Sequence, residues 1–151
     1  MLKLVKMKQN EYDVIKGKLI SDYAKEKVRV GHWQEDEAIE LSKETLEKIL
    51  KDGVDTSNHY LMSAYEDEEK KIGFIWFNIF NKSVFINALC IYDEFKGNDY
   101  EIKVVEALEE KSYDYGAKKI NLHSFGYNEG AIASYRKMGY EITDVYMNKK
   151  I

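Results

Sequence analysis

One segment near the end of the chain combines residue types and spacing that could support chemistry at the start of a helix. Asn128 is a residue type whose side chain caps free backbone amides where a helix begins. Ala131 and Tyr135 follow four residues apart, so both lie on one face of that helix. Ala131 leaves room for a ligand, and Tyr135 places a phenol hydroxyl, a hydrogen-bond donor, beside that room. Gly139 is expected to end the helix.

The rest of the sequence predicts helices and strands that follow one another without a linker. We therefore expect a single α/β domain over residues 1–151. Apolar residues at three- and four-residue steps predict helices, and short apolar runs between charged turns predict strands. A hairpin meander followed by a strand–helix–strand unit requires a mixed sheet. The predicted elements are a strand over 2–7, helices over 9–29 and 34–51, strands over 59–66, 71–80 and 84–91, a helix over 99–115, a strand over 119–125, a helix over 128–138 and one or two strands over 140–148.

The segment 128–140 resembles the N-x-x-A-x-x-x-Y-x-K-x-G-[FY] motif of the GNAT superfamily of N-acetyltransferases, and every defined position is filled. The wider chain is similar to a subgroup of small bacterial GNAT proteins, so the resemblance covers nearly the whole length. It implies an α/β GNAT fold, in which a mixed, mostly antiparallel sheet of six to seven strands contains splayed parallel central strands and is flanked by about four helices.

The resemblance also implies acetyl-CoA as cosubstrate and a primary amine of a small molecule or peptide as acceptor. In the family, the motif tyrosine protonates the leaving thiolate of CoA and the asparagine contacts the pantetheine arm, which assigns these roles to Tyr135 and Asn128. The arm lies between the strands expected over 84–91 and 119–125 and pairs with the main chain. The further cofactor contacts implied in this way are Leu89, Cys90, Ile91, Ala131 and Lys137.

The pyrophosphate loop of the superfamily usually reads Q/R-x-x-G-x-G/A before a helix, where free amides attract an anion and glycines allow close approach. The aligned segment keeps Lys96 and Gly97 but has Asp99 and Glu101 where small residues are usual. A carboxylate about 5 Å from a phosphate charge costs roughly 1–3 kcal/mol at an effective dielectric of 20–60. Asn98 and Glu101 also have the spacing of a capping box, which would occupy the helix amides.

Two alternatives follow for this loop. In one, both acids face solvent and the backbone still holds the pyrophosphate. In the other, the chain is a degenerate GNAT-fold binding module with weak or no use of CoA. Under the first alternative, the residues expected to bind the cofactor here are Lys96, Gly97, Asn98, Asp99, Tyr100, Glu101 and Ile102.

Transfer to an amine requires a base that removes a proton. Proteins of the resembling subgroup often carry an acid near position 88, where this chain has Ala88. His123 is one substitute, although a hydrogen-bonded histidine in a sheet is the alternative. Four residues at the end of the first long helix and in the loop after it are expected to line the acceptor pocket, with an exposed helix face or a hydrophobic staple as alternatives. These residues are Tyr23, Glu26, His32 and Trp33.

The composition of the chain argues against several other classes of protein. The formal net charge is −4 and lysines are interleaved with acids, which argues against nucleic-acid binding. No apolar run reaches the roughly 18 residues of a membrane span, and the lone cysteine, Cys90, predicts a reduced, cytoplasmic setting. No zinc-binding pattern is present, so no metal is expected. The aromatic residues of the strands leave a homodimer face open as an alternative, although alternation places some of them in the core: Trp76, Phe77, Phe80 and Phe85.

Overall fold

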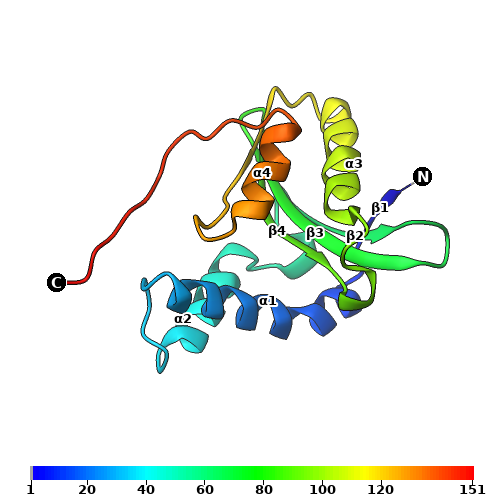
Figure 1. Cartoon of the computed structure of the whole chain (residues 1–151). Coiled ribbons are helices and arrows are strands. Elements are labelled where there is room, and N and C mark those ends of the chain that lie inside the picture. The colour runs from blue at the N-terminus through cyan, green and yellow to red at the C-terminus, as the bar shows by residue number, and fades with distance from the viewer. Residues whose placement is uncertain (1) are drawn as a thin grey trace.

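The computed structural model describes residues 2–151, which form a five-stranded sheet with a helical layer on each face (Figure 1). Helices α1 (Gln9–Arg29) and α2 (Ala38–Ile49) cover one face, and α3 (Tyr100–Asp114) and α4 (Glu129–Lys137) cover the other. These four helices match the expected number. The strands are β1 (Lys3–Lys6), β2 (His59–Tyr65), β3 (Lys71–Phe80), β4 (Ser83–Ile91) and β5 (Lys119–Leu122).

The strands lie in the order β1-β2-β3-β4-β5, and the pairs β1–β2, β2–β3 and β3–β4 are antiparallel. The β4–β5 pair is parallel, and α3 makes the crossover that a parallel connection requires. The predicted mixed, mostly antiparallel sheet is therefore confirmed, as are the three strands of the meander.

The predicted strand or strand pair over 140–148 is wrong. The chain after Tyr140 leaves the body of the protein as an extended segment without regular structure, shown in red in Figure 1. Among the described residues the sheet consequently has five strands instead of six to seven, and the parallel pair lies at one edge instead of at the centre. A strand is stable only when another strand satisfies its backbone groups, and local sequence does not reveal whether such a partner exists.

Two clusters of buried side chains hold the layers together. The α3 cluster, which includes Phe77, Val104 and Leu108, lies between the sheet and the layer of α3 and α4. The α1 cluster, which includes Tyr12, Leu46 and Phe74, lies between the sheet and the layer of α1 and α2. Each strand of the meander contributes to both clusters because its side chains alternate between the two faces.

The strand aromatics divide as alternation predicts. Trp76 and Phe77 are buried, whereas Phe80 is 74% exposed and Phe85 is 38% exposed. Only the last two are therefore available on the surface.

Candidate active site

Strands β4 and β5 separate part-way along their length. They pair only between Ser83–Ile86 and Lys119–Leu122, while β4 continues to pair with β3 as far as Ile91. The register on β3 shifts at this point: Phe77 pairs with Ile86 and Trp76 pairs with Ala88, which leaves Asn87 as an extra residue. Such a bulge bends its strand and increases the local twist. We call the resulting gap, between residues 87–91 and the chain that follows β5, the wedge.

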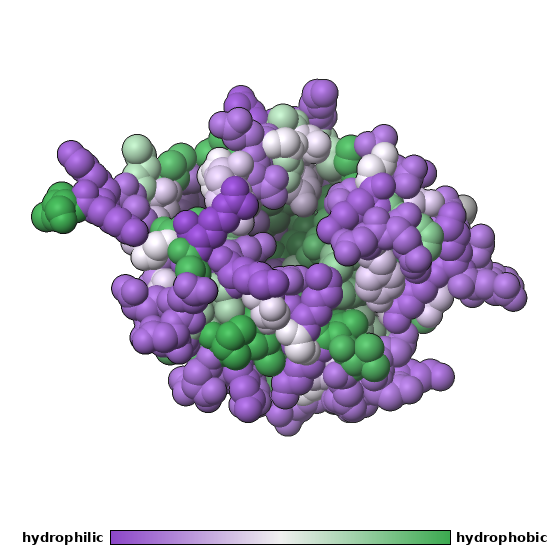
Figure 2. All heavy atoms as spheres, turned by 60° about the horizontal axis from the view of Figure 1, so that its bottom comes forward, coloured by the Kyte–Doolittle hydropathy of each residue, from purple (hydrophilic) through white to green (hydrophobic). Residues whose placement is uncertain are grey.

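The strand that borders the wedge is incompletely covered. Residues 87–90 are only half-buried although they lie within a strand flanked by two helical layers. Leu89 packs with the α3 cluster, and Ala88 and Cys90 pack with the α1 cluster. The edge of β4 that faces the wedge has no strand partner among residues 2–151, so an extended ligand with amide groups could pair with it. Figure 2 shows a recess with hydrophobic side chains at its base.

Tyr135 lies on the α3 side of the wedge. Its ring is half-buried, packs against the α3 cluster and lies 5.8 Å from the ring of Tyr140 between centroids. Burial raises the pKa of the Tyr135 phenol above its ordinary value of 10.0, and the negative charge of Glu101 raises it further. The hydroxyl is therefore protonated at neutral pH and can donate a hydrogen bond.

Asn128 takes the predicted position at the start of α4, but its side chain makes no capping hydrogen bond. Its backbone N–H instead donates to the carbonyl oxygen of Phe125 at 2.9 Å, which closes the turn before the helix. Within residues 2–151 the side-chain amide has no hydrogen-bond partner, so it is available to a ligand. Ala131 is half-buried on the next turn, and Lys137 is exposed at the other end of α4.

The loop before α3 presents a run of free backbone amides. In the described chain, none of the N–H groups of residues 97–102 donates a hydrogen bond to a protein acceptor. The predicted capping box is wrong: the Asn98 side chain donates to the carbonyl oxygen of Phe95 at 3.1 Å, and α3 has no side-chain cap. Gly97 has φ 86° and Asp99 has φ 56°. Left-handed residues of this kind occur in the turns whose successive backbone amides bind anions. Such a run of amides suits an anion.

Most side chains of this phosphate loop, residues 96–102, are exposed to solvent. Asp99 and Glu101 are exposed, and the Lys96 ammonium pairs with the Asp93 carboxylate at 2.8 Å on the surface. Tyr100 is 5% exposed and packs in the α3 cluster, so only its backbone faces the loop. Ile102 is half-buried. The loop thus combines free backbone amides with two exposed acids.

The end of α1 and the loop after it bring together three of the residues expected at the acceptor side. The rings of Tyr23 and Trp33 meet edge to face with centroids 5.5 Å apart. The Lys27 ammonium lies 5.5 Å from the Tyr23 ring and 5.7 Å from the Trp33 ring. The same ammonium is 3.4 Å from Nδ1 of His32. We call Tyr23, Lys27, His32 and Trp33 the acceptor cluster.

Glu26 lies on the neighbouring face of α1. Its carboxyl group is half-buried, and burial, with a smaller contribution from the charge of Asp22, raises its pKa above the ordinary value of 4.5. One turn further on, the Arg29 guanidinium lies 3.5 Å from the ring centroid of Tyr127. This contact joins the end of α1 to the loop between β5 and α4. A half-buried acid therefore lies next to the point where the first helix meets the far side of the wedge.

His123 is exposed just beyond the end of β5, which stops at Leu122 instead of the predicted residue 125. Its ring packs edge to face on Phe125 with centroids 4.7 Å apart, and Phe125 stacks on Tyr127 at 5.8 Å. Alternate residues of this extended chain thus form an aromatic ladder that ends at Arg29. The ladder does not include Glu26, and the structure gives His123 and Glu26 no direct contact.

Comparison with known proteins identifies the family of the chain. Residues 23–140 match the model of the Acetyltransferase (GNAT) family. The chain belongs to the GNAT family. It is 31% identical over 149 residues to the uncharacterised N-acetyltransferase YdgE of Bacillus subtilis (strain 168), covering 96% of this chain and 95% of that protein. The crystal structure of YycN from Bacillus subtilis, also named an uncharacterised N-acetyltransferase, superposes with a TM-score of 0.95 at 29% identity, over 100% of this chain and 99% of that one.

A more distant structure shows a shared fold alone. Glucosamine-6-phosphate N-acetyltransferase from Arabidopsis thaliana superposes with a TM-score of 0.57 at 18% identity, covering 99% of this chain and 98% of that one. In residues 2–151 of the present GNAT protein, no group of three or more His, Cys, Asp or Glu side chains is arranged to hold a metal ion. None of the described helices has the length and apolar character needed to cross a membrane.

Sequence reasoning missed three residues of this site: Asn87, Arg29 and Tyr127. The bulge at Asn87 has no local signature, because it arises from pairing with β3. The spacing of Asp22, Glu26 and Arg29 places them on one face of α1, so helical periodicity could have grouped them. Tyr127 continues the series of alternate residues His123 and Phe125, so the alternation used for His123 could have been continued to residue 127.

Proposed function

We propose that this GNAT protein is an N-acetyltransferase that moves an acetyl group from acetyl-CoA to a primary amine of a small molecule or peptide. The observation that carries the proposal is the wedge, where β4 parts from β5 beside the half-buried Tyr135 phenol. An open strand edge suits the amide-containing arm of CoA, and the free amides of residues 97–102 suit its pyrophosphate. Membership of the family supports the same assignment.

The two reactants would reach the wedge from opposite sides of the sheet. Tyr135 belongs to the α3 side, whereas the acceptor cluster lies at the end of α1 on the other side. Both substrates can therefore be held at once, which direct transfer in a ternary complex requires. Backbone groups near Leu89, Cys90 and Ile91 would hold the thioester in line with the incoming amine.

In the proposed step, the amine nitrogen attacks the carbonyl carbon of the thioester, the new C–N bond forms and the C–S bond breaks. The sulfur leaves with the bonding electron pair, and the Tyr135 hydroxyl donates its proton to it. The amine must lose a proton, and we assign the base to Glu26, whose half-buried carboxylate has a raised pKa. Aromatic faces of Tyr23 and Trp33 beside this acid suit an aliphatic amine.

Calorimetry and turnover measurements with Tyr135→Phe test the proposal. We expect acetyl-CoA to bind the unaltered chain with a micromolar Kd, and Tyr135→Phe to lower kcat by about 10²-fold or more, the range typical of a lost general acid. The Kd for acetyl-CoA should change little, because the phenol is needed mainly once the thiolate forms. Tyr113→Phe is the matched control, since Tyr113 is 80% exposed on α3.

A second function, a binding module without efficient use of CoA, is favoured by Asp99 and Glu101 in the phosphate loop. It predicts no heat of binding at millimolar acetyl-CoA. That result, or equal turnover in the Tyr135→Phe and Tyr113→Phe variants, would reject the acetyltransferase proposal.

A further inference from the structure

The acceptor cluster already holds an ammonium group, which belongs to the chain itself. The Lys27 ammonium lies 5.5 Å from the ring of Tyr23 and 5.7 Å from the ring of Trp33. Both distances are within the range of about 6 Å at which a ring face attracts a cation. Nδ1 of His32 is 3.4 Å from the same nitrogen. Because an ammonium has only N–H donors, this contact requires Nδ1 to be the acceptor and Nε2 to carry the proton.

The main chain of Lys27 helps to build the cluster that its side chain occupies. Its carbonyl oxygen accepts hydrogen bonds from the backbone N–H groups of His32 at 2.9 Å and Trp33 at 3.3 Å. Gly31 has φ 78°, a left-handed conformation that turns the chain at the end of α1. Tyr23 lies one turn earlier on the same face of α1. The rings are therefore positioned by backbone and helix, whichever side chain residue 27 carries.

No carboxylate accounts for the position of the Lys27 ammonium. Within residues 2–151, the ion pairs between lysines and acids do not include Lys27. The rings around it are partly open to solvent, with Tyr23 37% exposed. Aromatic faces that converge on a cation are the arrangement with which proteins bind ammonium ligands. A site for such a ligand thus lies next to Glu26, on the neighbouring face of α1, and Lys27 fills it.

We propose that the acceptor is a primary amine on an unbranched alkyl chain, as at the end of a lysine side chain, and that Lys27 occupies the position of its ammonium until the acceptor displaces it. The inference rests on the proposed function, which assigns the acceptor to this cluster. Lys27 itself shows which ligand shape the cluster admits: a flexible four-carbon stem that ends in a compact ammonium between two ring faces.

An internal occupant lowers the apparent affinity for an external amine, because only molecules with an empty site can bind it. n-Butylamine reproduces the lysine side chain from Cβ to Nζ and is the probe for an NMR titration without acetyl-CoA. Lys27→Ala empties the site and leaves the rings in place. We expect it to bind n-butylamine with a Kd about tenfold lower than that of the unaltered chain.

Two controls separate the site from a general effect of charge. Lys25→Ala changes the net charge equally, and Lys25 is exposed on α1 outside the cluster, so its Kd should equal that of the unaltered chain. tert-Butylamine has the charge of n-butylamine but a branched carbon next to nitrogen. It should bind Lys27→Ala about tenfold or more weakly than n-butylamine, because the methyl groups keep the ammonium from the ring faces.

The indole N–H resonances of the two tryptophans report where the amine binds. Trp33 lies in the cluster, whereas Trp76 is 7% exposed and its Nε1 donates to Nδ1 of His59 at 3.0 Å. n-Butylamine should shift the Trp33 resonance of Lys27→Ala and leave the Trp76 resonance in place. Adding Trp33→Leu assigns the resonance by its loss and should abolish the gain in affinity.

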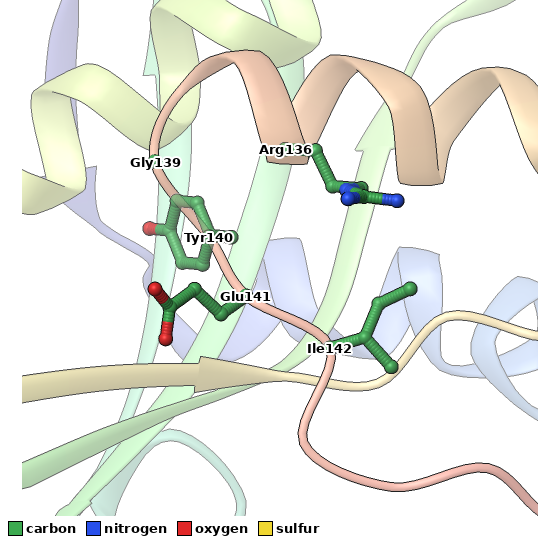
Figure 3. A pocket seen from close by; sticks show the side chains of 5 residues that line it. All are labelled: Arg136, Gly139, Tyr140, Glu141 and Ile142. Atoms are coloured by element: carbon green, nitrogen blue, oxygen red, sulfur yellow. The ribbon is translucent and has the colours of Figure 1, made fainter.

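A surface hollow of about 500 Å³ at the end of α4 is the alternative place for an amine. Figure 3 shows the Arg136 and Ile142 side chains on either side of this space, and Glu141 also lines it. The Glu141 carboxylate attracts an ammonium, but the Arg136 guanidinium in the same hollow repels it. Glu141→Gln should therefore leave the Kd of n-butylamine unchanged. A weaker Kd in this variant, with the Trp33 resonance unmoved, would place the amine in the hollow and overturn the proposal.

The source of the alkylamine is distinguished by two larger probes. A lower Kd for Nα-acetyl-lysine amide than for 1,5-diaminopentane supports a lysine of a peptide as acceptor, and the reverse order supports a free diamine. Either order requires the same ammonium site. Equal Kd values of Lys27→Ala and the unaltered chain for n-butylamine, or an equal gain in Lys25→Ala, overturn the proposal.

These binding measurements stand apart from acetyl transfer. If Lys27→Ala gains affinity as expected while Tyr135→Phe leaves turnover unchanged, the acetyltransferase proposal fails and the ammonium site remains. If turnover depends on Tyr135 and Lys27→Ala binds n-butylamine no more tightly, only the present inference fails.

Discussion

Tyr135 and Glu26 show how burial prepares two groups for opposite roles. Burial disfavours the charged form of each and raises both pKa values. For Tyr135, which must hold a proton until the thiolate forms, the shift preserves the acid at neutral pH. For Glu26, the shift moves a carboxylate from a weak base toward the strength needed to accept a proton from an amine.

The assignment of the base to Glu26 predicts opposite effects on activity and stability. We expect Glu26→Gln to lower kcat/KM by about 10²-fold or more, the range for a lost general base, and to remove the acid limb of the pH profile. His123→Gln should change kcat/KM by much less, because His123 is exposed beyond β5. Equal losses in both variants, or a larger loss for His123→Gln, would contradict the assignment.

The stability of the same variant follows from proton linkage. Because the folded-state pKa of Glu26 lies above 4.5, the folded state binds this proton more tightly than the unfolded state does. The stability of the fold therefore falls as pH rises from 4.5 through the raised pKa of the folded state. Glu26→Gln removes this cost, so its free energy of unfolding should exceed that of the unaltered chain at pH 7. The gain should vanish as pH falls below 4.5, where the carboxyl is protonated in both states. Urea titrations at pH 7 and pH 4 measure this difference.

The acids of the phosphate loop yield a separate prediction. Asp99 has φ 56°, a conformation that favours glycine, and it opens a helix with free amides. The double variant Asp99→Gly, Glu101→Gly should tighten acetyl-CoA binding by about tenfold or more, because each carboxylate near a phosphate costs roughly 1–3 kcal/mol. The gain should shrink in 1 M salt, where charges about 3 Å apart are already screened.

Glu68→Gly with Glu69→Gly changes the net charge equally in the exposed turn between β2 and β3 and serves as the control. Calorimetry should show an unchanged Kd for this control pair. An unchanged Kd for the Asp99→Gly, Glu101→Gly variant as well would show that the loop acids do not repel the ligand.

At the scale of elements, the sequence correctly predicted the helices and strands whose formation depends on local pattern. Periodicity predicted α1, α3 and α4 and the three strands of the meander, and the family motif placed Tyr135 on the helix α4. The start of α2 was predicted four residues early, because residues 35–37 form a turn before Ala38. What local pattern could not reveal were features that depend on a distant partner: the bulge at Asn87, the uncapped start of α3 and the absence of a strand after Tyr140.

The close approach of β3 to β4 gives a prediction at this scale. Gly73 pairs with Ile91, and a Cβ at Gly73 would overlap the carbonyl oxygen of Cys90. Gly73→Ala should therefore push β4 out of place where it borders the wedge. We expect it to destabilise the fold by about 1–3 kcal/mol, as overpacking does, and to weaken acetyl-CoA binding.

Gly17→Ala is the opposite control, because a Cβ there meets no atom within 4 Å. It lies inside α1, where alanine is favoured over glycine by roughly 0.5–1 kcal/mol, so this variant should be more stable than the unaltered chain. Chemical denaturation measures both variants. Equal stability of Gly73→Ala and Gly17→Ala would show that the contact at Cys90 does not constrain β4.

At the scale of the whole molecule, the sheet separates the two halves of the proposed reaction. The α3 side provides the amides, Asn128 and Tyr135, and the α1 side provides the acceptor cluster and Glu26. Only the wedge connects them, since elsewhere β4 is paired on both sides. The order of layers therefore determines the direction from which each substrate of the proposed reaction reaches the reacting atoms.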